Sequence, residues 1–360
     1  MPYIILKRWL FRTTLRIVNK TQILKINQLP KKSSVQGAGL QSVLIFDQYL
    51  LKKSSLNKWI KQFEFRIPVK AGESLKTINQ YAKVLSQIQK WQTTGVLHSP
   101  IQIVGLGGGS LGDFTGFVAS TYKRGCPLVH IPSTWLAAID SAHGGKTGLN
   151  LNQTKNQIGT FYPAAKVILS KKILQQQSVE RLTEAYGEVL KIALTNRPQL
   201  FLKANFAEKF LWDNILSLVN GKIQIVEKDP FEKKGIRHLL NLGHTMGHVY
   251  ETELNMPHGR AVMMGMLFSL RWSYHRGYIK RSDFIAIVQK LMSTDQAEKD
   301  FLKVNAMKTS KVYRHLSQDK KRVSAKHVRF IFIHKIGSIF TASVTAEQII
   351  DECERQRFNA

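Results

Sequence analysis

Short apolar runs alternate with segments of helical spacing through the first half of the chain, and this alternation restricts the fold more than any other feature. Residues 77–91, for example, repeat apolar side chains at helical spacing between two such runs. Strands that alternate with helices predict an α/β domain with a parallel sheet. The runs with the length of buried strands are residues 42–46, 65–69, 101–106, 128–131 and 166–169.

The sequence changes character near residue 176. Beyond that point helical spacing dominates, and there is almost no strand signal. We therefore expect two domains, an α/β domain at residues 1–176 and an all-α domain at residues 177–360. The expected helices of the second domain cover residues 180–194, 198–218, 238–253, 259–275 and 282–292.

The chain is strongly basic. Its 360 residues include 53 Lys and Arg against 24 Asp and Glu, which gives a formal charge of +29. A hydrophobic content of 43% excludes a disordered chain. The basic excess by itself keeps a nucleic-acid-binding protein open, because such an excess is typical of that class.

Residues 1–35 form a basic leader, and no acidic residue precedes Asp47. This stretch is interpreted as a targeting peptide, a basic arm or an ordinary first segment of a basic protein. Cys126 and Cys353 are far apart, which favours a reducing cytoplasm over a disulfide framework. The sequence contains no apolar run long enough to span a membrane, so no membrane association is expected.

A glycine-rich segment, Gly107 to Gly112, satisfies G-x-G-x-x-G directly after an apolar run. Such a loop either cradles a pyrophosphate at a helix N-terminus or makes a tight strand–helix turn. The acid expected about 20 residues later is missing, so the standard dinucleotide fingerprint is incomplete. A second glycine-rich stretch, residues 144–148, fails the P-loop pattern because Asp140 stands where that pattern needs glycine, and it is expected as a turn presenting Lys146.

His244 and His248 lie four residues apart, and on a helix they share one face. This spacing suits metal ligation, or a ligand with a neighbouring base, but it is also common in purely structural helices. His258 and Glu188 can complete a set of two histidines and one carboxylate, which is a catalytic zinc arrangement with an open position. Spacing alone does not decide whether these segments meet.

Taken in order, six segments resemble the 3-dehydroquinate synthase family of sugar-phosphate cyclases. The order of the motifs is more specific than any single one of them, and the resemblance runs from about residue 42 to Lys321. It implies a Rossmann-like N-terminal domain, a helical C-terminal domain, and a cytoplasmic homodimer. The matching segments are residues 107–125, 131–150, 155–163, 187–194, 235–251 and 258–262.

The resemblance also implies ligands for particular residues: NAD in a cleft between the domains, and one divalent metal, zinc or alternatively cobalt. The metal positions are Glu188, His244 and His258. The cofactor positions are Glu73, Lys76, Gly109, Ser110, Leu111, Gly112, Asp113, Ser133, Thr134, Lys146 and Lys155. The substrate and catalytic positions are Asp140, Asn156, Lys191, Lys222, Arg237, Asn241, His248 and Lys321, together with Arg124, which the family donates across a dimer interface.

The implied reaction converts 3-deoxy-D-arabino-heptulosonate 7-phosphate, a phosphorylated sugar acid, to 3-dehydroquinate. NAD transiently oxidises a hydroxyl, phosphate leaves by elimination, and the ring recloses as a carbocycle. Lys191, Lys222, Arg237 and Lys321 match the substrate's two anionic groups. His248 is the expected proton carrier near the leaving phosphate.

Two other functions stay open at this stage. One is a related cyclase of the 2-deoxy-scyllo-inosose synthase type. The other is a non-catalytic polyanion-binding relative, although no nucleic-acid motif supports it. One departure bears on the substrate: where the family reads His-Gly-Glu, this chain reads His258-Gly259-Arg260.

Overall fold

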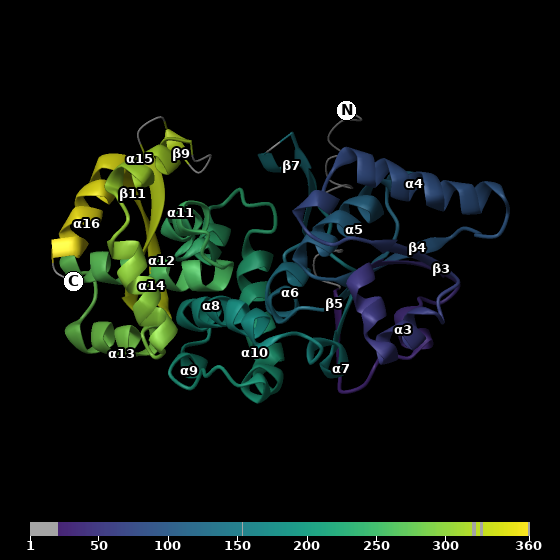
Figure 1. Cartoon of the computed structure of the whole chain (residues 1–360), viewed down its shortest axis with the longest axis horizontal. Helices are drawn as coiled ribbons and strands as arrows, with labels where there is room; N and C mark the ends of the chain where they lie inside the picture. Colours follow the sequence, from purple (N-terminus) through teal and green to yellow (C-terminus); the bar gives the residue numbers. More distant parts are fainter. Residues whose placement is uncertain (1–20, 153, 319–321, 325–326, 359–360) are drawn as a thin grey trace, which may run out of the picture. The chain divides into compact units, whose positions relative to one another are not determined.

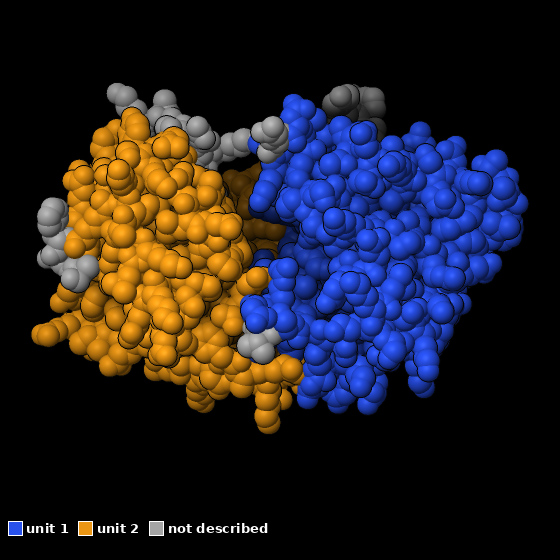
Figure 2. Space-filling model, in the orientation of Figure 1, with its two compact units in different colours: residues 1–182 blue, residues 183–360 orange. Residues whose placement is uncertain are grey.

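The computed structural model describes residues 21–152, 154–318, 322–324 and 327–358. The chain divides into two compact units, residues 1–182 and residues 183–360 (Figure 2). The boundary expected from the sequence was residue 176. Each unit is described separately below.

The first unit is built on a six-stranded sheet in which every pair of neighbouring strands is parallel, as predicted (Figure 1). Strand β4 (Ile101–Gly107), one of the two central strands, is buried along its whole length, which explains its largely apolar sequence. Its one polar residue, Gln102, is buried and donates to the Ser42 hydroxyl at 2.8 Å. In spatial order the strands are β1 (Gln22–Ile26), β8 (Lys166–Ser170), β5 (Leu128–Pro132), β4 (Ile101–Gly107), β2 (Gln41–Asp47) and β3 (Phe65–Val69).

Strand β1 was not expected. It lies within the stretch interpreted as a basic leader, yet it pairs in parallel with β8. Its sequence, QILKI, is short and interrupted by a lysine, so it carries little strand signal. At least this part of residues 1–35 therefore belongs to the folded unit, while residues 1–20 lie outside the described residues.

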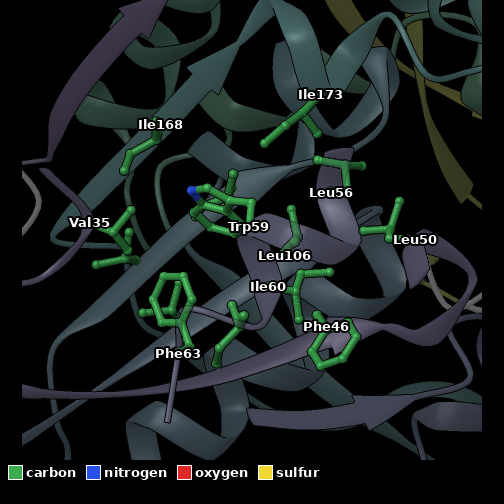
Figure 3. Close-up of a cluster of buried hydrophobic side chains, with 14 residues drawn as sticks. Val35, Phe46, Leu50, Leu56, Trp59, Ile60, Phe63, Leu106, Ile168 and Ile173 are labelled. Carbon is green, nitrogen blue, oxygen red and sulfur yellow. The ribbon is translucent and has the colours of Figure 1, made fainter. Parts of the chain in front are cut away.

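Helices cover the sheet through an apolar core. Leu56, Trp59 and Ile60 of α3 (Ser54–Ile60) pack against sheet residues such as Leu106 and Ile168 (Figure 3). The Trp59 indole N–H donates to the Pro30 carbonyl at 2.6 Å, which satisfies its only polar atom. The other helices of this unit are α2 (Lys32–Val35), α4 (Ile78–Thr93), α5 (Gly109–Thr121), α6 (Trp135–Ile139) and α7 (Lys171–Leu174), with short 3-10 turns between them.

An antiparallel hairpin, β6 (Lys146–Leu151) and β7 (Thr154–Phe161), follows α6. The segment 144–148 was expected as a turn, but Lys146 instead begins a strand. The alternation in Lys146–Leu151 is weak because two of its members, Gly148 and Asn150, are poor strand formers. Gly148 and Gly159 face each other across the hairpin, where an added Cβ at Gly159 would lie 2.4 Å from the Thr147 carbonyl oxygen.

The second unit is mainly helical, as predicted. Its central helix, α12 (His258–His275), is buried over most of its surface, so its apolar residues show little periodicity. The surrounding helices are α8 (Val179–Asn196), which begins at the end of the first unit, α9 (Pro198–Phe201), α10 (Glu208–Lys228), α11 (His244–Leu254), α13 (Arg281–Leu291), α14 (Asp295–Asn305), α15 (Thr309–Gln318) and α16 (Ala346–Phe358).

Two expected helices are divided differently. The stretch 198–218 splits into α9 and the first half of α10, and the helix expected at 238–253 starts only at His244. Residues before it form a 3-10 helix, η5 (Ile236–Asn241). Gly243 separates the two with a left-handed φ of 79°, a conformation that a side chain disfavours.

The expectation of an all-α second domain is wrong in one respect. Strands β9 (Arg322–Ser324), β10 (His327–Lys335) and β11 (Ser338–Thr345) form an antiparallel sheet. In β10, Val328 and all of residues 330–333 are buried, so its apolar residues are nearly continuous and do not alternate. A short apolar run of this kind does not distinguish a strand from a buried helix segment. Trp272 of α12 packs on Phe330, with ring centroids 4.7 Å apart. Within the described part of the chain, no helix is both long and apolar enough to cross a membrane.

A close approach between α5 and β6 gives a prediction for the first unit. A Cβ added at Gly116 would lie 2.5 Å from the Thr147 Cγ2. We expect Gly116→Ala to lower the free energy of unfolding by about 1–3 kcal/mol through overpacking. Adding Thr147→Ser should recover most of this loss, because it removes Cγ2 and keeps the hydroxyl that contacts Thr160. Urea unfolding of the two single variants and the double variant measures this, and purely additive losses would contradict it.

Candidate metal centre and ligand-binding residues

The structure brings Glu188, His244 and His258 together in the second unit. Glu188 lies on α8, while His244 and His258 are the first residues of α11 and α12. One ligand atom from each residue lies within 4.8 Å of those of the other two. The Glu188 Oε1 is 3.4 Å from the His244 Nε2 and 3.2 Å from the His258 Nε2. Three segments distant in sequence thus converge on one carboxylate.

Glycines beside each of the three residues make this convergence possible. A Cβ at Gly187 would lie 2.1 Å from the Gly259 carbonyl oxygen, and one at Gly259 would lie 1.8 Å from that of Glu184. A Cβ at Gly243 would lie 2.5 Å from the Val262 carbonyl oxygen. Because no side chain fits at these contacts, the backbones of α8 and the start of α11 reach α12 directly.

Both imidazoles are oriented through their second nitrogen. The His258 Nδ1 lies 2.7 Å from the Glu251 Oε1, and the His244 Nδ1 lies 3.2 Å from the Leu242 carbonyl oxygen. Donation of an Nδ1–H to these acceptors leaves each Nε2 facing Glu188. When a metal takes the place of an Nε2 proton there, each ring is in the tautomer that metal ligation requires. Two imidazole nitrogens and one carboxylate oxygen are borderline donors that suit zinc or cobalt.

The charges of the cluster also suit a cation. Burial raises the pKa of Glu188, but the Lys191 ammonium and the hydrogen bond to His258 outweigh it and lower the pKa to about 2. Burial lowers the pKa of His258, but hydrogen bonds to Glu188 and Glu251 outweigh it and raise the pKa to about 10. Two carboxylates thus stabilise positive charge at one point, where a divalent metal can replace a proton.

The other residues predicted to contact substrate in this unit include three buried cations. Lys191, Lys222 and Arg237 are each at most 6% exposed, which is rare for such side chains. Lys191 forms an ion pair with Glu188 one helical turn earlier. Arg237 donates to the Pro230 carbonyl at 3.0 Å, and its backbone N–H donates to the Asp229 carboxylate.

Lys222 is held by the contact of α10 with α8. A Cβ at the preceding residue, Gly221, would lie 3.0 Å from the Ile192 Cγ2, and Ile192 directly follows Lys191. The Asn196 side chain also donates to the Gly221 carbonyl at 2.9 Å.

His248 lies next to His244, with ring centroids 5.5 Å apart and nearly perpendicular planes. Asn241 ends η5, and Lys321 lies outside the described residues.

In the first unit, Lys76 connects three of the predicted positions. Its side chain is 2% exposed, and its ammonium donates to the Asp113 Oδ2 at 2.8 Å and to the Asn156 side-chain oxygen. Glu73 accepts a hydrogen bond from the Asn150 side chain at 3.0 Å. Cofactor positions Lys76 and Asp113 therefore share one network with the substrate position Asn156.

The glycine loop lies at the carboxyl ends of β4 and β5, where ligands bind in open parallel sheets. Gly107 pairs with Pro132 in the sheet, and the Ser133 N–H donates to the Gly107 carbonyl at 2.9 Å. A Cβ at Gly108 would lie 3.3 Å from Thr134, and one at Gly109 would lie 3.2 Å from the Ser141 hydroxyl. Helix α5 begins at Gly109 and includes Ser110, Leu111 and Gly112. A loop of glycines, which lack side chains, at the N-terminus of a 13-residue helix leaves backbone N–H groups accessible to a pyrophosphate.

The remaining predicted residues of this unit lie on turns and the hairpin. Asp140 ends α6, Lys146 begins β6, and Lys155 is exposed on β7. Arg124 is exposed, with a positive φ of 68°, in a turn after α5.

Sequence reasoning missed two acidic residues, one that accepts from His258 and one that pairs with Arg260. Glu251 follows His248 by three residues on α11, and this helical spacing could have indicated that the two side chains lie on the same face. Asp300 of α14 lies 40 residues from its partner Arg260, and no local pattern connects them. The Arg260 Nε donates to the Asp300 Oδ2 at 2.6 Å, and Asp300 is 1% exposed. Arg260 therefore extends toward α14 and neutralises a buried acid.

Comparisons with known proteins agree with this arrangement. Solved structures with a similar fold include a 2-deoxy-scyllo-inosose synthase at 20% identity and an iron-containing alcohol dehydrogenase at 17% identity, and these likenesses show the fold alone. The family model "3-dehydroquinate synthase N-terminal" matches residues 66–184, and "3-dehydroquinate synthase C-terminal" matches residues 185–322. The chain belongs to the 3-dehydroquinate synthase family.

Curated relatives carry the same family name. A 3-dehydroquinate synthase of Saccharolobus solfataricus is 34% identical over 247 residues, covering 66% of this chain and 68% of that protein. One of Clostridium acetobutylicum is 32% identical over 337 residues, covering 90% and 92%. A crystal structure of 2-deoxy-scyllo-inosose synthase with carbaglucose-6-phosphate, NAD+ and Co2+ has a TM-score of 0.76 at 20% identity, covering 92% and 96% of the two chains. That last likeness shows the shared fold.

The hydrogen bond from His258 to Glu251 gives a prediction for metal affinity. We expect Glu251→Gln to weaken zinc binding about 10- to 100-fold, because the imidazole loses its anionic acceptor. Glu253→Gln on the same helix is the matched control, since that carboxylate lies 3.5 Å from Lys311 instead. Competition with a chromophoric chelator measures both dissociation constants. Equal constants for the two variants would contradict the orienting role of Glu251.

The pairing of Arg260 with Asp300 gives a second prediction. Arg260→Glu should lower the free energy of unfolding by about 3–5 kcal/mol, because it leaves a buried carboxylate unpaired. Adding Asp300→Lys should recover part of that loss by reversing the pair. Lys303→Glu, an exposed change of the same charge on α14, is the control and should have little effect. Urea unfolding of the three variants and of the unaltered protein measures these losses. Equal losses from Arg260→Glu and Lys303→Glu would overturn the pairing.

Proposed function

We propose that this protein is a 3-dehydroquinate synthase, which converts 3-deoxy-D-arabino-heptulosonate 7-phosphate to 3-dehydroquinate and releases phosphate. The observation that carries the proposal is the convergence of Glu188, His244 and His258 beside a buried Lys191 in a chain of this family. A carboxylate and two oriented imidazoles hold the metal, and a buried ammonium next to them recognises an anionic substrate.

The proposed cofactors are NAD at the glycine loop and one zinc or cobalt ion at Glu188, His244 and His258. When bound, the metal supplies Lewis-acid polarisation of a substrate hydroxyl, and NAD supplies reversible hydride acceptance. The chain's own contribution is to keep the ligands in the right charge state: Lys191 holds Glu188 ionised, and Glu251 fixes the tautomer of His258.

The buried cations provide the substrate site of the second unit. Lys191, Lys222 and Arg237 give three positive charges for a substrate that carries a carboxylate and a phosphate. Their backbones are fixed by helix contacts at Gly221 and by the Asp229 carboxylate, so little reorganisation is needed on binding. We propose that Asn241 and Lys321 complete this set.

His248 is proposed to carry the proton during elimination. Its ring lies against His244 on the metal side of α11, and an imidazole can accept or donate a proton near neutral pH. From the first unit, we propose that Asn156 and Asp140 contact the substrate. The Lys76 ammonium orients Asn156 and holds it beside the cofactor position Asp113.

The proposal includes a cytoplasmic homodimer. Two free cysteines, Cys126 and Cys353, are consistent with a reducing compartment. The match of Arg124 to an arginine that the family donates to its partner's substrate supports the dimer, and its exposed side chain is available for that role.

A steady-state assay of phosphate release tests the function. We expect turnover of the heptulosonate phosphate that requires both NAD and metal, and that stops when a chelator removes the metal. Lys191→Met should lower kcat/KM about 10²- to 10³-fold through loss of a buried charge. Lys209→Met, which removes an exposed lysine, is the control and should keep full activity.

Two outcomes would contradict the proposal. One is no phosphate release from a preparation shown to contain NAD and one metal per chain. The other is release from glucose 6-phosphate, the sugar phosphate resembled by the ligand in the inosose synthase structure, with none from the heptulosonate phosphate. The second result would assign the chain to a different branch of the cyclases.

A further inference from the structure

Eight lysines of the first unit have no part in the proposed reaction. They lie in, or directly beside, four short helical segments: α2, η1 (Gln48–Lys52), α3 and α7. Six of them are exposed and two are half-buried. None is a predicted cofactor, metal or substrate residue. We call this set the lysine face, and its members are Lys31, Lys32, Lys52, Lys53, Lys58, Lys61, Lys171 and Lys172.

A single core places these four segments on the same side of the sheet. Val35 of α2, Leu50 of η1, Trp59 of α3 and Ile173 of α7 belong to one buried cluster, together with residues of the sheet (Figure 3). The apolar side chains of the segments are thus directed into the unit. Their lysines form the outer surface of the layer.

The opposite side of the sheet carries far less charge. Helices α4 and α5 cover it, because β3–α4–β4 crosses the sheet in the direction opposite to β2–α3–β3, and right-handed crossovers then use opposite sides (Figure 1). Their 16 and 13 residues include two bases, Lys83 and Lys90, and one acid, Asp113. The four segments of the lysine face contain no acid, and among the described residues no ion pair involves its lysines. A generally basic composition would affect both sides alike, so it does not explain this asymmetry.

Two apolar side chains are exposed beside these lysines. In η1, Tyr49 is 56% exposed and Leu51 is 37% exposed, while Leu50 between them anchors the segment in the core. The Lys52 ammonium lies 5.4 Å from the centre of the Tyr49 ring. Exposed tyrosine and leucine next to lysine are typical of protein surfaces that lie at the headgroup level of a bilayer.

The types of residue involved favour lipid over nucleic acid as the polyanion. The lysine face contains no arginine, which is the residue that nucleic-acid recognition prefers. Residues 1–20, which lie outside the described residues, contain five Lys and Arg and no acid, together with Trp9, Leu10 and Phe11. A basic sequence that also contains tryptophan, phenylalanine and leucine is typical of membrane-surface segments.

We propose that the lysine face binds the surface of an anionic lipid bilayer, with Tyr49 and Leu51 entering the headgroup region. The negative potential of the bilayer attracts the lysines, and the two apolar side chains supply the second contribution that stable surface binding needs. Such binding requires no apolar span, whose lack was the reason to expect no membrane association. The lysine face is separate from the proposed reaction, since its binding is measured without turnover.

Co-sedimentation of the full chain with lipid vesicles tests the proposal. The probe is a vesicle of phosphatidylcholine with about 30% phosphatidylserine, and a vesicle of phosphatidylcholine alone is its uncharged counterpart. In about 0.1 M salt we expect binding to the anionic vesicle and about tenfold weaker binding to the neutral one. Raising the salt to about 0.5 M should remove most of the difference, because it screens exposed charges.

Charge reversal on the two sides of the sheet separates this surface from the basicity of the whole chain. Lys52→Glu combined with Lys58→Glu should weaken binding to the anionic vesicle about tenfold or more. Lys83→Glu combined with Lys90→Glu changes the net charge equally on the opposite side and is the matched control. It should change binding less than about twofold. All four lysines are exposed, so both double variants are expected to fold.

The apolar contribution is tested without a change of charge. Leu51→Ser should weaken binding to the anionic vesicle about threefold or more, because the bilayer no longer buries the side chain. Leu302→Ser on α14 is the control, since that leucine is 68% exposed in the other unit and should not contribute.

Three results would overturn the proposal. The first is no binding to the anionic vesicle in about 0.1 M salt. The second is equal weakening by the two double variants, or no weakening by Leu51→Ser, either of which would reduce the binding to net charge. The third is displacement of the vesicles by oligouridylate at an equal concentration of phosphate, which would assign the lysine face to nucleic acid.

Discussion

Close backbone contacts at glycine residues fix the positions of α8 and α11 against α12 in the second unit. Gly187 meets Gly259, and Gly243 meets Val262 and the start of the next turn at Gly265, at distances where no Cβ fits. Each of these contacts lies beside a metal-ligand position. A methyl group added at any of these glycines would fit only if one helix moved away from α12. The side-chain atoms of Glu188, His244 and His258 would then separate by a comparable distance. The convergence of the three proposed metal ligands is therefore a property of helix packing as much as of the side chains themselves.

The charges of the site follow from that packing. Because α8 approaches α12 so closely, Glu188 is buried at 1% exposure, and its negative charge must be compensated within the protein. Lys191 and His258 provide the compensation, and Glu251 balances the charge of His258 in turn.

The large basic excess of the whole chain has a different origin. Only a few of its 53 Lys and Arg occupy ligand positions, and the excess owes at least as much to the scarcity of acids, 24 in 360 residues.

The sequence predicted those parts that local patterns encode. Strand β4 is apolar apart from Gln102 and is followed by glycines, and the parallel sheet follows from such runs alternating with helices. Strand β1 and the hairpin of β10 and β11 were missed because their stability comes from the partner strand, which a local window does not contain. The three ligand positions could be named from the order of motifs. Their convergence could not be derived from spacing, because it depends on glycine contacts between residues up to 75 positions apart, as at Gly259 and Glu184.

Arg260 shows how a departure from a family pattern is accommodated. A base in place of an acid next to a metal ligand suggests, from sequence alone, an altered metal charge or an altered substrate. In the structure its guanidinium is bound by Asp300, and Gln296 donates to the same carboxylate at 3.0 Å. The positive charge is thus balanced by a buried acid on α14, and Arg260 is absent from the group of side chains that surrounds Glu188. The arginine at this position joins α12 to α14, and Glu188, His244 and His258 still lie together. Arg260 therefore contributes to the stability of the second unit. Its presence in place of the family's glutamate gives no reason to expect a different substrate.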